Sequence, residues 1–376
     1  MDPKTAEKFE KTWQRPEETV KAWKEKTGGK AVGLALVDVP EELVWAAGAL
    51  PVSILARDVS FQNVDKHLQQ FACSYSRTVV ELAESNELDY LDGLIMPYAC
   101  DTTRCMDLIF KYMDRFDFYE CARIPRRDGA AGVEKYYNME LKRMAANLSA
   151  FTGKKVDEAS LSDAIKAYNR VRDLLQKMRE AVRKGAEGIT PTEYFSAVRA
   201  AMVMAPDDAA ALLEEAVSQI GDGKSNGMPT VVVAGKLPEP PELIGVLTGA
   251  GLHLLEDHLA VGGRWIEAKA SEGGDPWEAI VSRQIGRLPF SGIWSKRENR
   301  ASYLMERVKE LSADGAIFLV QKFCEIAELD YPGIKEELEK EGVPLLSIET
   351  DFRRSSLEGV KTRVEAFAEM LRENKG

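Results

Sequence analysis

Apolar positions along this chain follow two patterns: short runs of strand length that alternate with helices, and continuous helical spacing. The pattern changes twice along the chain. In the first third, apolar runs of strand length alternate with segments of helix length. The expected strands are residues 31–37, 51–55, 93–97 and 116–124. Strands that alternate with helices are typical of a mostly parallel sheet. This part is therefore predicted to be an α/β unit. Before it, residues 8–26 are expected to form an exposed helix that is interrupted or begins near Pro16.

The middle of the chain, from Val133 to about Gly221, shows only helical spacing. The stretch SLSDAIKAYNRVRDLLQKMREAVRKG carries apolar residues three and four positions apart, with Ser160 as the expected N-cap. A second α/β unit follows, with expected strands at 230–234, 316–320 and 343–348 and expected helices at 300–313, 331–342 and 356–374.

The predicted fold class is α/β, with two similar Rossmann/flavodoxin-like domains that each contain a parallel sheet. A helical insert separates the two domains, and an N-terminal helix precedes them. The expected boundaries are 1–30 for the N-terminal helix, 31–132 for the first α/β domain, 133–225 for the helical region and 226–376 for the second α/β domain. A chain of 376 residues is too long for one ordinary core, which agrees with this division.

Composition narrows the class of protein. The chain is 45% hydrophobic and 30% charged, as in soluble globular proteins. It has no apolar run of about 18 residues, so we expect no membrane span. The charged N-terminus lacks the apolar stretch of a signal peptide, so we expect a cytoplasmic protein. The net charge of −11 argues against nucleic acid as a partner, because a phosphate backbone needs a basic face.

Three of the five cysteines stand at comparable places. Cys100 follows the strand GLIMP by three residues, Cys324 follows the strand AIFLV by four, and a helix is expected after each. Cys73 precedes another expected helix. Ligands of open parallel sheets bind beyond the carboxyl ends of the strands, so we expect these thiols to meet in a crevice between the domains. Nearby helix N-termini are expected to lower their pKa and favour the thiolate form that binds metals.

Spacing alone leaves two interpretations open. The separations of 26 and 223 residues form no local metal motif, and a lone cysteine is more often a core residue than a ligand. Cys105 is expected to pack on the apolar side of its helix, and Cys121 to belong to the core or the crevice wall. The histidines at 67, 253 and 258 are scattered, and SQIGDGKS (218–225) lacks the first glycine of a phosphate-binding loop. Neither a histidine metal site nor an ATP site is expected.

The residues around these cysteines resemble a known family, the subunits of 2-hydroxyacyl-CoA dehydratases and benzoyl-CoA reductases. The matching stretches are VPEELVWAAGALPVSI (39–54), FACSYSR (71–77), LDGLIMPYACDTTR (91–104), DGAIFLVQKFCE (314–325), DYPGIKEELEKEGVPLLSIETD (330–351) and TRVEAFAEML (362–371). The chain length is similar to that of the smaller subunit. The motifs FLVQKFCE and KTRVEAF look closer to the reductase than to the dehydratase.

The resemblance implies one 4Fe-4S cluster per chain, held by Cys73, Cys100 and Cys324. It also implies a heterodimer with a larger homologous subunit, an acyl-CoA substrate, and a separate activator that uses ATP to deliver low-potential electrons. The expected activity is that of a benzoyl-CoA reductase-type enzyme. The alternatives are a 2-hydroxyacyl-CoA dehydratase subunit, an electron relay whose sister subunit binds substrate, or a two-domain binding protein without a cluster.

Secondary candidates each have two interpretations. Two groups of residues flank the cysteines: residues 101–104 follow Cys100, and Gln321 and Lys322 precede Cys324. They would either tune the electronic properties of the cluster or have only a local structural role, such as capping a helix. Arginines 123, 126 and 127 would bind CoA phosphates or form a solvated loop. Glu41 and Glu42 are expected to be first-turn acids of the helix that begins at Pro40, rather than catalysts.

Overall fold

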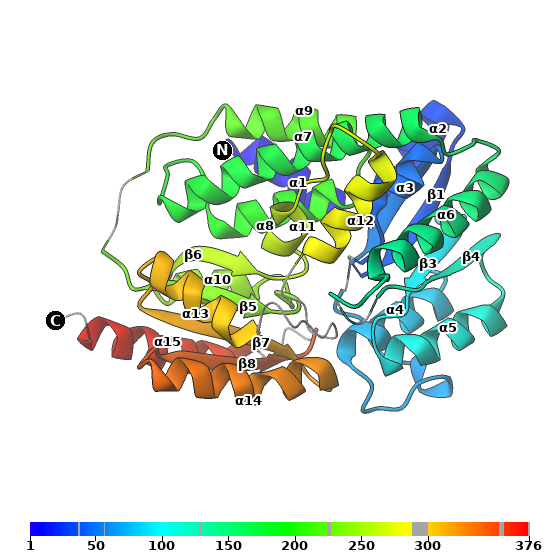
Figure 1. Ribbon diagram of the computed structural model, residues 1–376. Coiled ribbons are helices and arrows are strands. Elements are labelled where there is room, and N and C mark those ends of the chain that lie inside the picture. Colours follow the sequence, from blue (N-terminus) through cyan, green and yellow to red (C-terminus); the bar gives the residue numbers. More distant parts are fainter. Residues whose placement is uncertain are drawn as a thin grey trace.

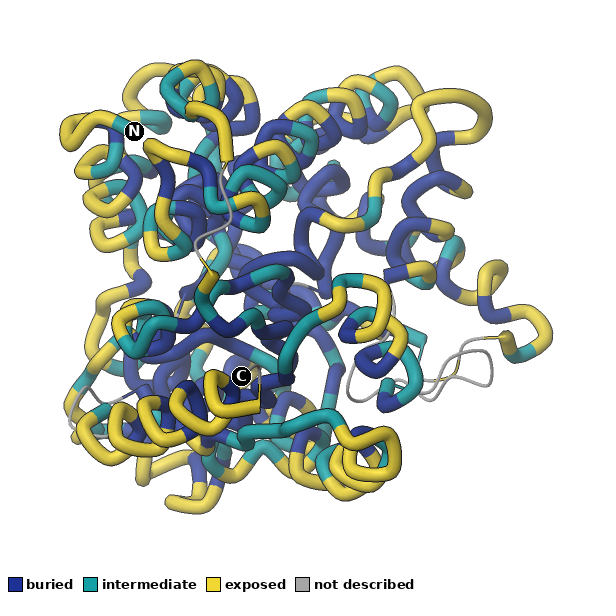
Figure 2. The backbone as a smooth tube through the Cα atoms, turned by 90° about the vertical axis from the view of Figure 1, so that its left-hand side faces the viewer, coloured by how far each residue is buried: buried dark blue, intermediate teal, exposed yellow. Residues whose placement is uncertain are grey.

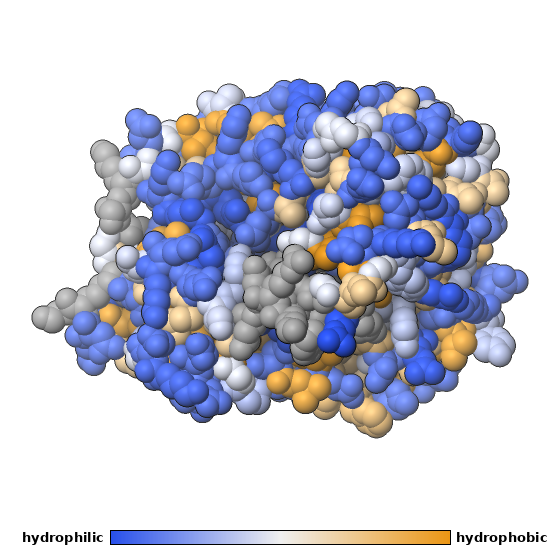
Figure 3. Space-filling view, in the orientation of Figure 1, coloured by the Kyte–Doolittle hydropathy of each residue, from blue (hydrophilic) through white to orange (hydrophobic). Residues whose placement is uncertain are grey.

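The computed structural model describes residues 1–36, 38–55, 57–125, 127, 129–223, 227–287, 300–352 and 357–374. Two parallel sheets of four strands lie in different halves of the molecule, with a layer of helices beside them (Figure 1). The α/β class and the presence of two similar Rossmann-like units are thereby confirmed. None of the helices in the described part of the chain combines the length and the apolar composition that a membrane span requires. The face in Figure 3 is mostly hydrophilic, with scattered apolar patches.

The two sheets have the same strand order. The first contains β1 (Lys30–Ala35), β2 (Ala49–Ile54), β3 (Gly93–Pro97) and β4 (Phe118–Ala122), in the order β2-β1-β3-β4. The second contains β5 (Thr230–Gly235), β6 (His253–His258), β7 (Gly315–Gln321) and β8 (Leu345–Thr350), in the order β6-β5-β7-β8. In both sheets the order reverses direction between the first and third strands. This is the topological switch point, where ligands of such sheets bind.

Both sheets are buried on both faces, as parallel sheets usually are. Alternate residues of β5 and β7 belong to different hydrophobic clusters: Val231 and Ile317 lie in one, and Val232 and Ala316 in the other. The cluster that contains Val231 also contains residues of the first sheet. Figure 2 accordingly shows a dark interior and outer turns that are mostly exposed.

The helices of the two units connect successive strands, except for the last helix, which follows β8. Those of the first unit are α3 (Glu41–Ala46), α4 (Ser74–Glu84) and α5 (Asp101–Met113), with a short 3-10 turn η1 (Val64–Lys66). Those from the second half of the chain are α10 (Leu243–Gly249), α11 (Gly263–Glu267), α12 (Pro276–Gly286), α13 (Arg300–Glu310), α14 (Glu325–Lys340) and α15 (Leu357–Glu373).

The helical layer consists mainly of α6 (Val133–Thr152), α7 (Glu158–Arg183), α8 (Pro191–Ala201) and α9 (Pro206–Val217). Helix α12 packs against α6 and α7, although it is far from them in sequence. The N-cap of α7 is Asp157 rather than Ser160, because the two residues form a capping box in which Ser160 occupies the third helical position. The domain boundaries given above stay a prediction.

Several element boundaries differ from the expectation. The N-terminal segment forms two helices, α1 (Pro3–Gln14) and α2 (Pro16–Thr27), and both bury an apolar side chain, Phe9 and Val20 respectively. Helix α1 packs on α8, where the Trp13 indole donates a hydrogen bond to Ser196 Oγ (3.2 Å). Helix α14 begins at Glu325 instead of Tyr331, since Pro332 is tolerated within it.

Candidate functional site

Each of the three predicted cysteines is the N-cap of a helix. Cys73 precedes α4, Cys100 precedes α5 and Cys324 precedes α14, and all three are half-buried. Cys100 follows β3 and Cys324 follows β7, the third strands of the two sheets. The two residues therefore occupy equivalent positions beside the two switch points.

Tyr75 ties the start of α4 to the first sheet. Its hydroxyl accepts a hydrogen bond from the Leu36 amide (2.9 Å) just after β1 and donates one to the Ile54 carbonyl (3.0 Å) at the end of β2. These contacts hold Cys73 near the carboxyl edge of the sheet. The Cys73 thiol donates a further hydrogen bond to Ser76 Oγ (3.2 Å).

A capping box fixes Cys100. The Thr103 hydroxyl accepts hydrogen bonds from the amides of Ala99 and Cys100, both at 2.9 Å, while the Thr103 amide approaches the Cys100 sulfur at 3.5 Å. Thr103 is therefore the capping partner of the cysteine, and neither Asp101 nor Thr102 is the N-cap of this helix. An amide that points at a sulfur favours negative charge on it.

The three thiols interact electrostatically with one another. Burial raises the pKa of Cys73 to about 11, and the charges of Cys324 and Cys100 add to this rise. Burial also raises the pKa of Cys324, again with a contribution from Cys100. The expected lowering of their pKa is wrong for these two thiols in the protein alone, because desolvation of the thiolate outweighs the helix N-termini. A cationic centre shared by the thiols would reverse that balance.

The donor set is suited to a cluster rather than to a single ion. Among the residues that the structure describes, no three His, Cys, Asp or Glu side chains are arranged to hold one metal ion. Three thiols that affect one another's ionisation would suit a cubane cluster, in which each thiolate binds a different iron. Cys73, Cys100 and Cys324 are the residues that would hold it.

Two charged residues near the thiols were missed in the sequence. Lys236 follows β5, the first strand of the second sheet, and Asp38 follows β1, the first strand of the first sheet. Burial lowers the pKa of Lys236, while the charges of Cys324, Asp38 and Cys100 act in the opposite direction. Lys236 and Asp38 occupy comparable places, each after the first strand of its sheet. A prediction of the strand order would therefore have indicated that both residues lie near the switch points.

The remaining sequence candidates take structural positions. Cys105 is exposed on α5, whereas it was expected to pack on the apolar side. Cys121 is half-buried in β4, where burial raises its pKa to about 11. The buried Gln321 side chain donates to the Leu237 carbonyl (2.7 Å), and the Lys322 amide donates to the Thr350 carbonyl (2.8 Å). Arginines 123 and 127 are exposed, and residue 126 lies outside the described part of the chain.

Glu41 and Glu42 are first-turn acids of α3, as expected, but their environment was not foreseen. Both are buried and bind Arg172 of α7 and Arg283 of α12. The Arg172–Glu42 pair is 2.8 Å long and the Arg283 pairs are 3.2 Å long. These partners are more than a hundred residues away in sequence, so no local pattern could have indicated them.

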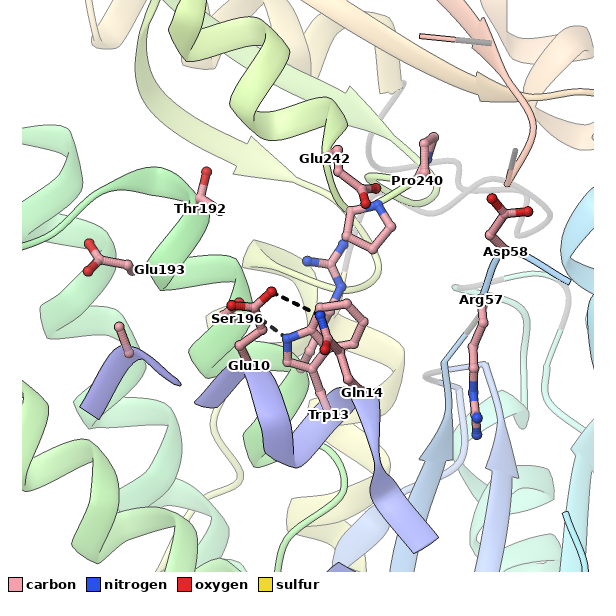
Figure 4. Close-up of a pocket in the computed structure, with 13 residues that line it drawn as sticks. Glu10, Trp13, Gln14, Arg57, Asp58, Thr192, Glu193, Ser196, Pro240 and Glu242 are labelled. Atoms are coloured by element: carbon pink, nitrogen blue, oxygen red, sulfur yellow. Dashed lines mark hydrogen bonds between the residues drawn. The ribbon is translucent and has the colours of Figure 1, made fainter. Parts of the chain in front are cut away.

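Two cavities lie beside the segment that follows β2. One of about 470 Å³ is lined by α1, α8 and the segment around Pro240 (Figure 4). The other, of about 400 Å³, is lined by Ala72 and Phe323, the neighbours of Cys73 and Cys324. Arg57 and Asp58 line both cavities. The second cavity is the more relevant to the thiols, since it adjoins two of the three.

Similarity to known proteins extends over nearly the whole chain. The (R)-phenyllactyl-CoA dehydratase beta subunit of Clostridium sporogenes is 27% identical over 96% of this chain and 97% of its own length. The lactoyl-CoA dehydratase beta subunit of Anaerotignum propionicum is 28% identical over 95% and 96%, respectively. One subunit of the benzoyl-CoA reductase of Thauera aromatica is 24% identical over 93% of each chain.

The family described as "2-hydroxyglutaryl-CoA dehydratase, D-component" matches residues 36–371. This range contains the helical layer, all three N-cap cysteines and both sheets except β1, which precedes it. The resemblance seen in the sequence is thereby confirmed, and this chain belongs to the 2-hydroxyglutaryl-CoA dehydratase D-component family, whose members include enzyme subunits.

Proposed function

We propose that this chain is the iron–sulfur subunit of an enzyme that transfers single low-potential electrons to acyl-CoA thioesters. One 4Fe-4S cluster would be held by Cys73, Cys100 and Cys324. The observation that carries the proposal is that three N-cap thiols from both α/β units affect one another's ionisation, in a chain that matches dehydratase and reductase subunits over nearly its full length. When bound, such a cluster supplies one-electron chemistry.

The residues of this chain would prepare the site for negative charge. The backbone amides of Ser76, Thr103 and Ala327, in the first turns of α4, α5 and α14, favour negative charge on the three sulfurs, and the Lys236 ammonium group adds a cation. Two of the thiols are desolvated, which strengthens each of these interactions. The chain would thus hold three thiolates together and oppose their mutual repulsion.

The partners in this proposal are a homologous larger subunit and an ATP-dependent activator. The relatives are named as subunits, two of them as beta subunits, which supports assembly with a sister chain. The phosphate-loop look-alike at 218–225 begins at Ser218, which ends α9, and its residues 224 and 225 lie outside the described part of the chain. ATP chemistry therefore belongs to the activator in this proposal.

Two reactions are candidates within the family. The sequence motifs favoured a benzoyl-CoA reductase-type reaction. The identities favour a 2-hydroxyacyl-CoA dehydratase, since the dehydratase beta subunits are 27% and 28% identical and the reductase subunit is 24% identical. We place the dehydratase first and the reductase second. Water loss from a 2-hydroxyacyl-CoA, or reduction of benzoyl-CoA, would distinguish them in the assembled enzyme.

The first experiment measures iron and sulfide, with electron paramagnetic resonance, on the chain purified without oxygen. We expect about four irons per chain in the wild type. The Cys100→Ser variant should lose them, and Cys105→Ser, a change one turn along the same helix, should keep them. A folded wild-type chain that stays free of iron after anaerobic reconstitution would overturn the proposal and support a binding protein without a cluster.

The relay alternative needs a further measurement. If substrate binds beside this cluster, 2-hydroxyacyl-CoA should change the paramagnetic resonance spectrum of the reduced chain. If this subunit only relays electrons to its sister, the spectrum of the separate chain should stay unchanged when the acyl-CoA is added.

A further inference from the structure

Opposite charges line different depths of the cavity between α1, α8 and the segment around Pro240 (Figure 4). Arg199 lines this cavity and is only 2% exposed, whereas Glu10, Asp58 and Glu242 also line it and are exposed. The volume of about 470 Å³ is in the range of small-molecule sites. A ligand in this cavity would therefore meet a guanidinium group on the inner side and carboxylates where the cavity opens to solvent.

The Arg199 guanidinium group has more donors than acceptors around it. Its Nη2 group donates to the Pro238 carbonyl (2.9 Å) and to Glu239 Oε1 (3.4 Å). Its Nε group is buried and has no partner among the described residues. A guanidinium group carries five N–H donors, and a buried donor without an acceptor is destabilising. Arg199 therefore favours a ligand that brings acceptor oxygens.

Glu239 is a weak counter-ion for Arg199. Burial raises the pKa of the Glu239 carboxyl group to about 7, and the charge of Glu242 adds to this rise. Near neutral pH, Glu239 is therefore negatively charged in only part of the molecules. A carboxylate from a ligand would supply the charge that Glu239 provides incompletely.

Ser196 offers a second donor on the same helix. Its hydroxyl oxygen accepts a hydrogen bond from Trp13 Nε1 (3.2 Å), while within the described part of the chain its own O–H group donates to no acceptor. The Trp13 ring lies against the Arg199 guanidinium group, 5.3 Å from ring centroid to Cζ. With Pro240 and Pro241 it forms an apolar wall of the cavity. Arg199 and Ser196 thus suit a carboxylate, and the wall suits a methylene chain.

The carboxylates at the opening suit an ammonium group. Glu10 accepts a hydrogen bond from Gln14 Nε2 (2.9 Å), and a carboxylate can accept several. Two further charged side chains line the cavity but are engaged elsewhere. Glu193 caps its own helix, and Arg57 pairs with Glu87 (3.5 Å). The opening is therefore more favourable for a cation than for an anion.

We propose that this cavity binds a small linear zwitterion, with a carboxylate at one end and an ammonium group at the other. Arg199 and Ser196 would hold the carboxylate, the chain would pack on Trp13, and the ammonium group would reach Glu10 at the opening. Because the two kinds of charge lie at different depths, a chain of several methylenes fits better than a molecule whose charges are adjacent. Basic amino acids and ω-amino acids have this chemistry.

The test is isothermal titration calorimetry of the full chain, purified anaerobically, with 6-aminohexanoate. Hexylamine lacks the carboxylate and hexanoate lacks the ammonium group, so the two are matched controls. We expect saturable binding of 6-aminohexanoate at one site per chain. Hexylamine should bind at least about tenfold more weakly, because a buried charge-assisted contact is lost. Hexanoate should bind about threefold more weakly, because the lost contact is exposed.

Two variants assign the two ends without replacing the buried Arg199. Ser196→Ala should weaken binding of 6-aminohexanoate and leave hexylamine unchanged. Glu10→Gln should weaken binding of 6-aminohexanoate and leave hexanoate unchanged. Glu7→Gln is the control, since Glu7 is exposed one turn earlier on the same helix and does not line the cavity.

Three outcomes would overturn the proposal. They are the absence of 6-aminohexanoate binding at millimolar concentration, equal binding of either control compound, and equal weakening in Glu7→Gln and Glu10→Gln. L-Lysine has the same two end groups and an additional α-ammonium group. Tighter binding of lysine than of 6-aminohexanoate would assign the cavity to free basic amino acids, and weaker binding would assign it to ω-amino acids. None of these measurements involves iron, so this proposal and the proposed function can fail independently.

Discussion

At the scale of single residues, burial decides the behaviour of the ionisable groups. The Cys73 thiol at a helix N-terminus, the Lys236 ammonium group after β5 and the Glu239 carboxyl group all have a pKa shifted by desolvation toward the neutral form. For the Cys73 thiol, the helix N-terminus taken alone would have predicted a lowered pKa. The charges around each group, rather than its neighbours in sequence, set its protonation.

Glu239 should make stability depend on pH. Burial raises the pKa of this carboxyl group to about 7, although Arg199 lies 3.4 Å away. The folded chain then holds more protons on it than the unfolded chain between about pH 4.5 and about pH 7, so the free energy of unfolding falls as the pH rises through this interval. Relative to Glu239→Gln, the wild type should lose roughly 2–3 kcal/mol between about pH 5 and about pH 8.

Urea denaturation at several pH values measures this difference. Glu358→Gln, a change on the exposed first turn of α15, is the control and should parallel the wild type at every pH. Parallel curves for wild type and Glu239→Gln would show that Glu239 is ionised across the whole range.

Lys236 should tune the reduction potential of the proposed cluster. Its ammonium group interacts with Cys324 and Cys100, and a nearby cation stabilises the more negative, reduced state. Lys236→Met should therefore lower the potential by roughly 60 mV, a tenfold change for a one-electron couple. Redox titration followed by paramagnetic resonance measures it. Lys335→Met on the exposed face of α14 should leave the potential unchanged, and an equal shift in both variants would argue against a local effect.

At the scale of secondary-structure elements, buried ion pairs join helices that are far apart in the sequence. Glu41 and Glu42 at the start of α3 bind Arg172 of α7 and Arg283 of α12. Helix α3 has only six residues, so its own backbone hydrogen bonds cannot hold it in place. The ion pairs therefore fix the orientation of α3 between β1 and β2.

Removal of one partner should be strongly destabilising. In Arg172→Met the two glutamates lose one of their two arginines while they remain buried, and the free energy of unfolding should fall by roughly 3–5 kcal/mol. Urea denaturation near neutral pH measures the loss. Arg170→Met, on the same helix but half-exposed, should change it by less than about 1 kcal/mol. A small effect of Arg172→Met would mean that water reaches the glutamates.

At the scale of the whole molecule, two sheets with the same strand order bring equivalent positions together. Cys100 and Cys324 follow the third strands, and Asp38 and Lys236 follow the first. Cys73 joins them through the attachment of Tyr75 to β1 and β2. The candidate site is therefore assembled from both halves of the chain, and neither half contains all of its thiols.

This arrangement predicts that the cluster clamps the two units. Cys73→Ser in the first unit and Cys324→Ser in the second should each lose most of the iron, although more than two hundred residues separate them. Both variants should melt at the temperature of the iron-free wild type, below that of the loaded chain. Cys121→Ser should keep its iron and the higher melting temperature. Retention of a full cluster in Cys324→Ser would show that one unit suffices.

Local sequence determined the elements and the positions of the cysteines along them. The apolar runs around Val32, Leu94 and Ile317 indicate buried strands because a parallel sheet covered on both faces needs them. The helices after Cys100 and Cys73 follow from short-range spacing and capping residues. These features depend on neighbours within a few positions, so a single sequence is enough to predict them.

Tertiary structure decided what no short window contains. Arg172 and Arg283 meet Glu41 across 131 and 242 residues, respectively, and Lys236 faces thiols from both units only after the sheets have formed. The raised pKa of Cys73 depends on desolvation, which is a property of the packed molecule. The sequence by itself therefore determined which residues stand at strand ends and helix starts. Packing alone decided which of them share a site and what charge they bear, because burial and Coulomb interactions depend on distance in space.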